Sequence, residues 1–398
     1  MTQAVHHQEL ETEGRKESSD DELLSFLETF LHQLQVQSGV IKEEDIGSHP
    51  DELIRRSLKG LLDSLSGDGE PPLREVIVKL PNVRKHIDAT HLADLIARAV
   101  QYIFRMKDDT SYLKFTDDNW RSFYSSLLPE QVSDISYILV HKEVATHVLT
   151  RYRGLSALNT FFYQQTQTPL KIADIGCSLR YGLRDSVKVT MKEEELHSFV
   201  DLTDGKVIKS LLLAEKPAFS YALGIDIQPP DFDWVAACAY YSKYDETRKG
   251  LQQYRNQLDA DERGGVPIHC MTADIAEEST VLEIQSSDVP KFDIIYGSMV
   301  LYQLSKKMRV HAISNINTLL QPNGVFAELT FKNTRNWFLP WNAITTVRFK
   351  NGAIFTEPYQ WLEWDSSRCG SVRPGKDYEL VNDCIRGVKY HHQKGDHE

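Results

Sequence analysis

Two carboxylates and a glycine turn carry the strongest chemical signal in this chain. Asp226 and Asp274 each end an apolar run, so both are predicted to lie at the ends of buried strands. A carboxylate in that position accepts hydrogen bonds from ribose hydroxyls. Another apolar run, 171–175, leads into a turn that starts with Gly176, where the missing side chain lets the backbone approach a ligand. The chemistry indicated is the binding of a nucleotide or nucleoside.

The elements that must position these residues alternate between strands and helices. The strand-like segments are 171–175, 221–226, 268–274, 292–302 and 319–331, and a helix-like stretch separates the last two. The first segment is apolar or small at nearly every position, which is typical of a strand covered on both faces by helices. Strands that alternate with helices predict an α/β domain with a parallel sheet.

The order of these segments resembles a class I S-adenosylmethionine-dependent methyltransferase over residues 166–335. The turn Leu-Leu-Gln-Pro-Asn-Gly at 319–324 is similar to the Leu-Leu-Lys-Pro-Gly-Gly that precedes the fifth strand in that family. The resemblance implies S-adenosylmethionine as cofactor. It also implies a Rossmann-like sheet, mostly parallel with a C-terminal antiparallel hairpin, and residues 343–356 look like such a hairpin with an Asn-Gly turn.

The resemblance assigns the cofactor site to four strand ends. In that family the first glycine turn holds the amino acid end of the cofactor, and the acid after the second strand binds the ribose. The acid after the third strand lies by the adenine amino group, and the segment after the fourth strand faces the transferred methyl. The implied cofactor residues are Asp174, Gly176, Ser178, Gly182, Asp226, Ile227, Asp274, Ile275, Ser298 and Met299. The one catalytic candidate is Tyr302, which would orient a nucleophile or close over the cofactor.

Two departures from the family pattern concern the first turn and its distance from Asp226. The usual Gly-x-Gly is replaced by Gly176 followed by Cys177 and Ser178, and the next glycine is Gly182. About fifty residues separate Gly176 from Asp226, roughly twice what one crossover helix needs. We therefore expect an insertion near 185–220. In both departures the chain resembles a divergent group of bacterial methyltransferase-like proteins with a Gly-x-Ser-x-Gly turn. This resemblance implies a fold but no reaction.

Each candidate residue also has a purely structural interpretation. Asp226 would end a strand and cap the next helix, and Asp274 would open a helix with its charge near the positive end of the dipole. Asp174 would be costly to bury without hydrogen bonds, which suggests that it organises the turn. Met299 and Tyr302 would belong to the packing of the helix that follows.

Three functions are compatible with these patterns. The first is a methyltransferase acting on a small molecule or an uncommon protein side chain. The second is a non-enzymatic binding or scaffold protein in which the altered turn marks a degraded cofactor site. The third is a nicotinamide-dependent oxidoreductase, which would require Gly-x-Gly-x-x-Gly after the first strand, and this chain lacks it.

Composition narrows the partners and the compartment. The net charge is −12, which argues against nucleic acid as the main ligand because phosphate backbones favour concentrated Lys and Arg. The five cysteines contain no Cys-x-x-Cys pair, so neither a disulfide framework nor a metal site is predicted, and a reducing cytoplasm suits them. The N-terminus lacks the apolar core of a signal peptide, and no segment is long enough to span a membrane.

The rest of the chain is predicted to be helical at its N-terminal side and flexible at its ends. We expect a disordered tail at 1–20, a helical domain at 21–165, the methyltransferase-like domain at 166–385 and a flexible tail at 386–398. The three-and-four-residue spacing of apolar side chains predicts the helices. They are 23–34, 53–65, 91–106, 133–152 and 155–163. Residues 378–381 are expected to form a further strand.

Overall fold

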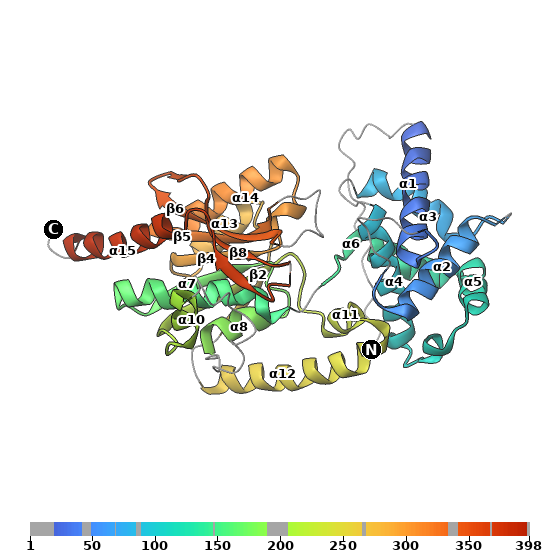
Figure 1. Ribbon diagram of the computed structural model, residues 1–398, viewed down its shortest axis with the longest axis horizontal. Helices are drawn as coiled ribbons and strands as arrows, with labels where there is room; N and C mark the ends of the chain where they lie inside the picture. The colour runs from blue at the N-terminus through green and yellow to red at the C-terminus, as the bar shows by residue number, and fades with distance from the viewer. Residues whose placement is uncertain are drawn as a thin grey trace. The chain divides into compact units, whose positions relative to one another are not determined.

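The computed structural model describes residues 20–41, 49–67, 69–84, 89–145, 148–188, 206–264, 268–332, 341–366 and 368–395. The chain divides into two compact units, Met1–Val144 and Ala145–Glu398, whose elements are labelled in Figure 1. Residues 1–19 of the tail expected at 1–20 and much of the insertion expected near 185–220 lie outside the described residues, whereas Asp20 begins the first helix. None of the helices within the described ranges is both long and apolar enough to cross a membrane.

The first unit is helical in all of its described secondary structure. Its elements are α1 (Asp20–Ser38), α2 (Glu52–Leu65), α3 (Pro72–Val83), α4 (Ala89–Met106), η1 (Ser111–Lys114), α5 (Asp117–Ser125) and α6 (Pro129–His141). Helix α2 begins where the Asp51 side chain accepts hydrogen bonds from the backbone amides of Leu53 and Ile54. The helix predicted over 133–152 is wrong in extent, because α6 ends at His141 and Lys142 is extended.

An aromatic cluster forms much of the core of this first unit. Trp120 of α5 is fully buried and packs edge-on against Phe104 of α4 and Phe115, with ring centroids 6.5 and 5.0 Å apart. Gly60 of α2 lets α2 and α5 approach closely, because a Cβ atom at Gly60 would lie 2.4 Å from the Cβ atom of Trp120. Helices α2 and α5 are thus held together by a small residue facing a large one.

The second unit is built on one sheet of nine strands. The strands are β1 (Leu170–Ile175), β2 (Phe219–Asp226), β3 (Ile268–Thr272), β4 (Phe292–Ser298), β5 (Leu320–Phe331), β6 (Ala343–Asn351), β7 (Ile354–Phe355), β8 (Tyr359–Trp364) and β9 (Val372–Pro374). Their order is β3-β2-β1-β4-β5-β6-β8-β9, with β7 paired to β6. Strands β1 to β5 are parallel, and β6 to β9 are antiparallel to their neighbours. The predicted α/β fold class is therefore confirmed.

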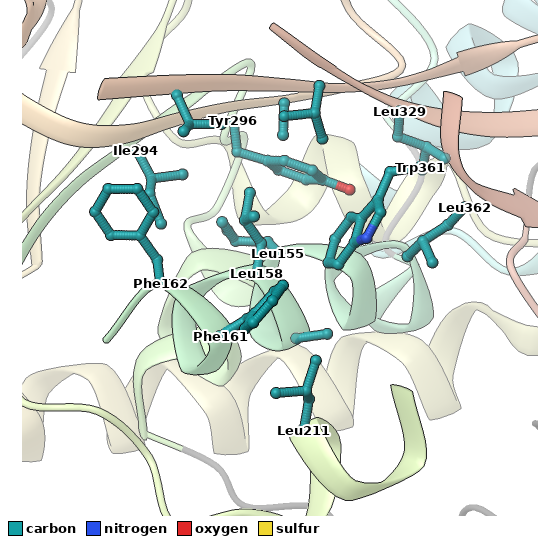
Figure 2. Packing of buried hydrophobic residues seen from close by; sticks show 14 of the residues in the cluster. Leu155, Leu158, Phe161, Phe162, Leu211, Ile294, Tyr296, Leu329, Trp361 and Leu362 are labelled. Atoms are coloured by element: carbon teal, nitrogen blue, oxygen red, sulfur yellow. The ribbon is translucent and has the colours of Figure 1, made fainter. Parts of the chain in front are cut away.

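Helices cover both faces of the parallel strands. One face packs against α7 (Arg153–Thr166), α8 (Tyr181–Lys188), α10 (Lys206–Leu213) and α15 (Tyr378–Gly395). Figure 2 shows this core, in which Leu158 and Phe161 of α7 lie beneath Tyr296 and Trp361 of the sheet. The opposite face packs against α13 (Glu278–Ser286) and α14 (Lys306–Leu319).

Helix α7 belongs to the second unit, although the sequence predicts the boundary after it, at 165. The physical reason is that its apolar residues pack against the sheet. It is preceded by a short helix, η2 (Leu149–Tyr152). The remaining helices of this unit are α11 (Phe232–Ala237), η3 (Tyr241–Lys243), α12 (Tyr244–Gly264) and η4 (Leu301–Gln303).

The C-terminal segment differs in part from the sequence prediction. The hairpin with an Asn-Gly turn is confirmed, because Asn351 pairs with Ile354 across β6 and β7. The strand predicted at 378–381 is wrong, since these residues begin α15. The apolar residues Tyr378, Val381 and Ile385 recur at helical spacing and are all buried against the sheet.

Candidate functional site

The site begins at the turn between β1 and α8, where the order of the strands reverses. Strand β1 lies between β2 and β4, so the loops after β1 and β4 leave the sheet side by side, which is where α/β sheets bind ligands. Gly176 has a φ of +69°, and a Cβ atom there would lie 2.1 Å from Val300 Cγ2. Glycine is required because the loop after β4 occupies this space and the backbone is left-handed. The amide of Gly176 donates to the carbonyl of Ile225 at 2.8 Å, which ties the turn to β2.

The second part of the site is the carboxylate of Asp226 at the end of β2. The amide of Ser178 donates to its Oδ2 at 2.8 Å, and the amide of Gln228 donates to its Oδ1 at 3.1 Å. Burial raises the pKa of Asp226, and these backbone hydrogen bonds oppose that rise. The structure thus brings Ser178 and Asp226 together. Each carboxylate oxygen has a second lone pair with which to accept from a hydroxyl.

Asp174, the penultimate residue of β1, lies below the turn and is fully buried. The hydroxyl of Tyr152 donates to its Oδ2 at 2.8 Å, while its Oδ1 has no hydrogen-bond partner among the described residues. Burial raises the pKa of Asp174 well above its usual range. The hydrogen bond from Tyr152 lowers that pKa and the charge of Asp226 raises it further. Burial therefore favours the uncharged form of Asp174, and a further hydrogen-bond donor or a cation beside it would favour the charged form.

Gly182 has a structural role that the sequence does not reveal. A Cβ atom at Gly182 would lie 1.9 Å from the ring of Tyr152, so the glycine makes room for that ring. Tyr152 comes from η2, which precedes the first strand by one helix. Sequence reasoning missed Tyr152 because it assigned the residue to the end of a long helix, and no local pattern links it to the turn.

A small cavity of about 60 Å³ borders the turn. Four predicted cofactor residues line it, which are Gly176, Ser178, Gly182 and Ser298. The other lining residues were not predicted, and they are Val148, Leu149, Arg151, Tyr152, Cys177, Leu179, Tyr181 and Val235. Ser298 ends β4, and its buried Oγ has no hydrogen-bond partner among the described residues. The cavity therefore meets the ends of β1 and β4, as the switch point requires.

Two residues after β4 pack rather than face this cavity. Met299 has a φ of +57° and is buried in the core that faces α7. Its amide donates to the carbonyl of Leu329 at 2.9 Å. The ring of Tyr302, in η4, packs edge-on against Phe331 with centroids 5.3 Å apart. Neither residue is among those lining the cavity.

The predicted cofactor residues that follow β2 and β3 are spread out. Asp274 Oδ1 accepts from the amide of Ala276 at 2.8 Å and so closes a turn. The helix start that the sequence also allows at Asp274 is wrong, because α13 begins at Glu278 and has no side-chain cap. Ile275 is buried in the core beneath α13 and α14, and the Ile227 side chain is exposed. The loop after β3 is nonetheless tied to β2, because the amide of Ala273 donates to the carbonyl of Asp226 at 2.8 Å.

Comparison with known proteins gives only weak similarities. No family model matches the chain, and no curated protein matches it. Among solved structures, it is similar to the N-methyltransferase NodS from Bradyrhizobium japonicum with bound S-adenosylhomocysteine (16% identity, 47% of this chain, 64% of that chain, TM-score 0.26). It is also similar to DesVI from Streptomyces venezuelae (11% identity, 51% of this chain, 64% of that chain, TM-score 0.26).

A third similar structure is the 1,6-didemethyltoxoflavin-N1-methyltransferase of Burkholderia thailandensis with bound 1,6-didemethyltoxoflavin and S-adenosylhomocysteine (11% identity, 60% of this chain, 66% of that chain, TM-score 0.25). In all three cases the match covers less than two thirds of the solved structure. Scores this low carry no argument about activity. By its own strand order, glycine turn and antiparallel end, the second unit has a Rossmann-like fold.

Proposed function

We propose that this protein is an S-adenosylmethionine-dependent methyltransferase that transfers a methyl group by direct displacement to a small-molecule acceptor. The observation that carries the proposal is the carboxylate of Asp226, which lies at the tip of β2 and is held against the first turn by the amide of Ser178. A carboxylate at that point of an α/β sheet is placed to accept from the two ribose hydroxyls of a nucleoside. We place the protein in the cytoplasm, where its free cysteines stay reduced.

Two buried polar atoms fit the charged end of this cofactor. Asp174 Oδ1 and Ser298 Oγ lie at the ends of neighbouring strands and lack hydrogen-bond partners among the described residues. Buried polar groups of this kind need a partner, because leaving one unpaired costs about 1–3 kcal/mol. A cation near Asp174 would also favour its ionised form and so offset the rise in pKa that burial causes.

The chemistry asked of the protein is modest. The cofactor supplies a methyl group already activated on a sulfonium. The contribution of this chain is to align the acceptor and exclude water, and a general base is needed only where the nucleophile holds its proton tightly. Ser298 at the end of β4 borders the cavity at the point where an acceptor would meet the methyl group. Tyr302 remains the candidate for closing this region.

The site must rearrange to admit the cofactor. Cavities that bind ligands of this size measure about 300 Å³ or more, whereas the cavity above the turn encloses about 60 Å³. The ring of Tyr152 rests on Gly182 and forms one wall. We therefore expect binding to move the Tyr152 ring and the η2 segment away from Gly182.

The small size of the cavity also favours a second candidate function. Val300 fills the space at Gly176, and Tyr152 fills the space at Gly182. A fold that has lost its cofactor would close in this way. The alternative is a non-enzymatic binding or scaffold protein, and it differs from the first proposal in predicting no affinity for the cofactor.

Isothermal titration of the full chain with S-adenosylhomocysteine tests both candidates. The methyltransferase proposal predicts micromolar affinity for the wild type and a ten- to hundredfold loss in Asp226→Asn, because a charge-assisted hydrogen bond contributes about 1.5–3 kcal/mol. Asp233→Asn is the matched control, since Asp233 is a half-exposed carboxylate on the nearby helix α11 that pairs with Arg248. Its affinity should equal that of the wild type.

Failure to bind has a definite meaning in this design. If the wild type is folded by circular dichroism and gives no heat at millimolar ligand, the enzyme proposal is wrong and the scaffold alternative takes its place. If binding occurs and is equally strong in both variants, the cofactor lies elsewhere and the assigned role of Asp226 is wrong. Binding lost only in Asp226→Asn justifies a screen for acceptors with labelled S-adenosylmethionine.

A further inference from the structure

Two cysteines from distant parts of the sequence meet beside the first turn. Cys177 follows Gly176 and is buried, whereas Cys270 lies in the edge strand β3 and is exposed. The Cys177 sulfur lies over Gly224, the β2 residue that pairs with Cys270 in the sheet, so the two thiols are neighbours. The pair thus combines one exposed thiol with one buried thiol.

The sheet register brings these sulfur atoms together. Asp174, Gly224 and Cys270 are aligned across β1, β2 and β3. Gly224 has no side chain in this row, and a Cβ atom there would lie 2.6 Å from the Cys177 Sγ. The Cys177 thiol therefore occupies the space above Gly224 and reaches the neighbouring strand. Any larger residue at 224 would separate the two sulfurs.

The surroundings activate the exposed member of the pair. The neighbouring Cys177 thiol and the charge of Arg180 lower the pKa of Cys270 to about 7, against the opposing effects of burial and Asp226. Arg180 is fixed in place, because its Nη1 donates to the carbonyl of Ile268 at 2.7 Å. Since the thiolate is the reactive form of cysteine, Cys270 is a nucleophile at neutral pH.

We propose that Cys177 and Cys270 form a redox-sensitive dithiol that hydrogen peroxide converts into an intramolecular disulfide. In the first step the Cys270 thiolate attacks one peroxide oxygen, the O–O bond breaks, and protonation of the leaving hydroxide releases water and leaves a sulfenic acid. In the second step the Cys177 sulfur attacks the Cys270 sulfur, the S–O bond breaks, and the Cys177 proton leaves with the hydroxide as a second water. Two thiols are oxidised by two electrons and one peroxide is reduced.

Closing this bond would distort the cofactor turn. A disulfide requires the two sulfurs to approach to about 2.05 Å, well below the separation of two thiols that are not bonded to each other. Cys177 lies between Gly176 and Ser178, and the Ser178 amide holds the carboxylate of Asp226. Pulling Cys177 toward β3 would strain this contact. The consequence for cofactor affinity rests on the proposed function, whereas formation of the disulfide does not.

The test is to treat the reduced full chain with a few equivalents of hydrogen peroxide, block the remaining thiols with iodoacetamide and digest it without reductant. Mass spectrometry should find one peptide pair joined through Cys177 and Cys270, two hydrogens lighter than the sum, and dithiothreitol should remove it. Cys270→Ser should abolish the joined pair and leave Cys177 alkylated once the protein is unfolded. Cys384→Ser, in helix α15, is the matched control and should leave the pair unchanged.

Two results would overturn the proposal. One is oxidation of Cys270 to a sulfinic acid while Cys177 stays reduced. The other is a Cys270 disulfide between two chains, seen as a dimer on a non-reducing gel. The Cys270→Ser variant changes an exposed strand residue, so its folding is expected to survive, and circular dichroism checks this.

A separate measurement tests the effect on the cofactor site. S-adenosylhomocysteine is titrated into the reduced and the peroxide-treated protein, and we expect at least a tenfold weaker affinity after oxidation that dithiothreitol reverses. Equal affinity in both states would show that the disulfide does not regulate the site. If neither state binds while the joined peptides are found, the methyltransferase proposal fails and the dithiol proposal stands.

Discussion

The hydroxyl of Tyr152 donates a 2.8 Å hydrogen bond to the carboxyl group of Asp174, which joins the short helix η2 to the end of strand β1. This contact closes one wall of the cavity and satisfies one of the two oxygens of a fully buried acid. The packing of the Tyr152 ring on Gly182 holds the hydroxyl in place. The contact is therefore both a stabilising interaction and the obstacle that a bound cofactor must move.

Removing the donor should destabilise the protein. Tyr152→Phe keeps the ring but leaves both oxygens of Asp174 without a hydrogen bond, and an unsatisfied buried polar group costs about 1–3 kcal/mol of unfolding free energy. Urea unfolding followed by fluorescence measures this loss. Tyr137→Phe is the control, because Tyr137 is 61% exposed and its change should stay within about 0.5 kcal/mol. A loss of that small size in Tyr152→Phe would contradict the prediction.

The buried acid should also make stability depend on pH. Burial raises the pKa of Asp174 above its ordinary value of 3.8, so above pH 3.8 the folded protein holds a proton that the unfolded chain releases. This contribution is complete below that pH and is lost as the pH rises through the folded-state pKa. Asp174→Asn does not titrate, and its stability relative to the wild type should increase between pH 4.5 and 8. A difference that does not change with pH would show that Asp174 keeps its ordinary pKa.

The first turn should tolerate no side chain at Gly176. Gly176→Ala combines a left-handed backbone, which costs about 1–2 kcal/mol, with a clash against Val300 that costs about 1–3 kcal/mol. Gly352→Ala is the matched control, because Gly352 has a φ of +62° but nothing within 4 Å of the added Cβ. In a Val300→Ala background the clash is removed and the backbone strain remains, so Gly176→Ala should lower the unfolding free energy by less. Equal unfolding free energies for the two glycine variants would refute the role given to Val300.

Alkylation of Cys270 should titrate near neutral pH. The rate with iodoacetamide is expected to be half-maximal at about pH 7, because the neighbouring Cys177 thiol and then the charge of Arg180 lower the pKa of Cys270. Cys177→Ala removes the larger effect and should move the midpoint toward the usual value of 9.0. Cys384 is an internal comparison, since burial raises its pKa and its alkylation should need a higher pH. Rates are read from peptide masses, and an unchanged Cys270 midpoint in Cys177→Ala would disprove the coupling.

Lys216 should lower stability as the pH falls. It donates to the hydroxyl of Ser156 on α7, and burial lowers its pKa from 10.5 to about 8. Between those values the unfolded chain binds a proton that the folded protein does not, so stability present above pH 10.5 is lost as the pH falls toward 8. Lys216→Met should therefore gain stability relative to the wild type between pH 10 and 8, as measured by urea unfolding. No gain in relative stability over this range would mean that Lys216 stays charged in the folded state.

The sequence by itself determined the strands, the fold class and two anchors of the site. Buried strands are short runs of apolar residues, and Gly176 and Asp226 directly follow or end such runs, so their places at the carboxyl edge of the sheet follow from local order. The structure places the first turn beside Asp226, where the amide of Ser178 donates to its carboxylate. Parallel strands alone make such neighbours predictable, because their ends meet at one edge.

The tertiary structure alone decided which side chains fill that edge. Tyr152, Val300 and Cys270 reach the turn from separate elements, and no spacing in the sequence records that they meet. Their contacts depend on the strand register and on the missing side chains of Gly182 and Gly224, which admit a ring and a thiol. The spacing of apolar residues predicts the helices and strands, because it reflects which face of each element is buried. Close packing between distant elements depends on shapes that appear only when the sheet is assembled.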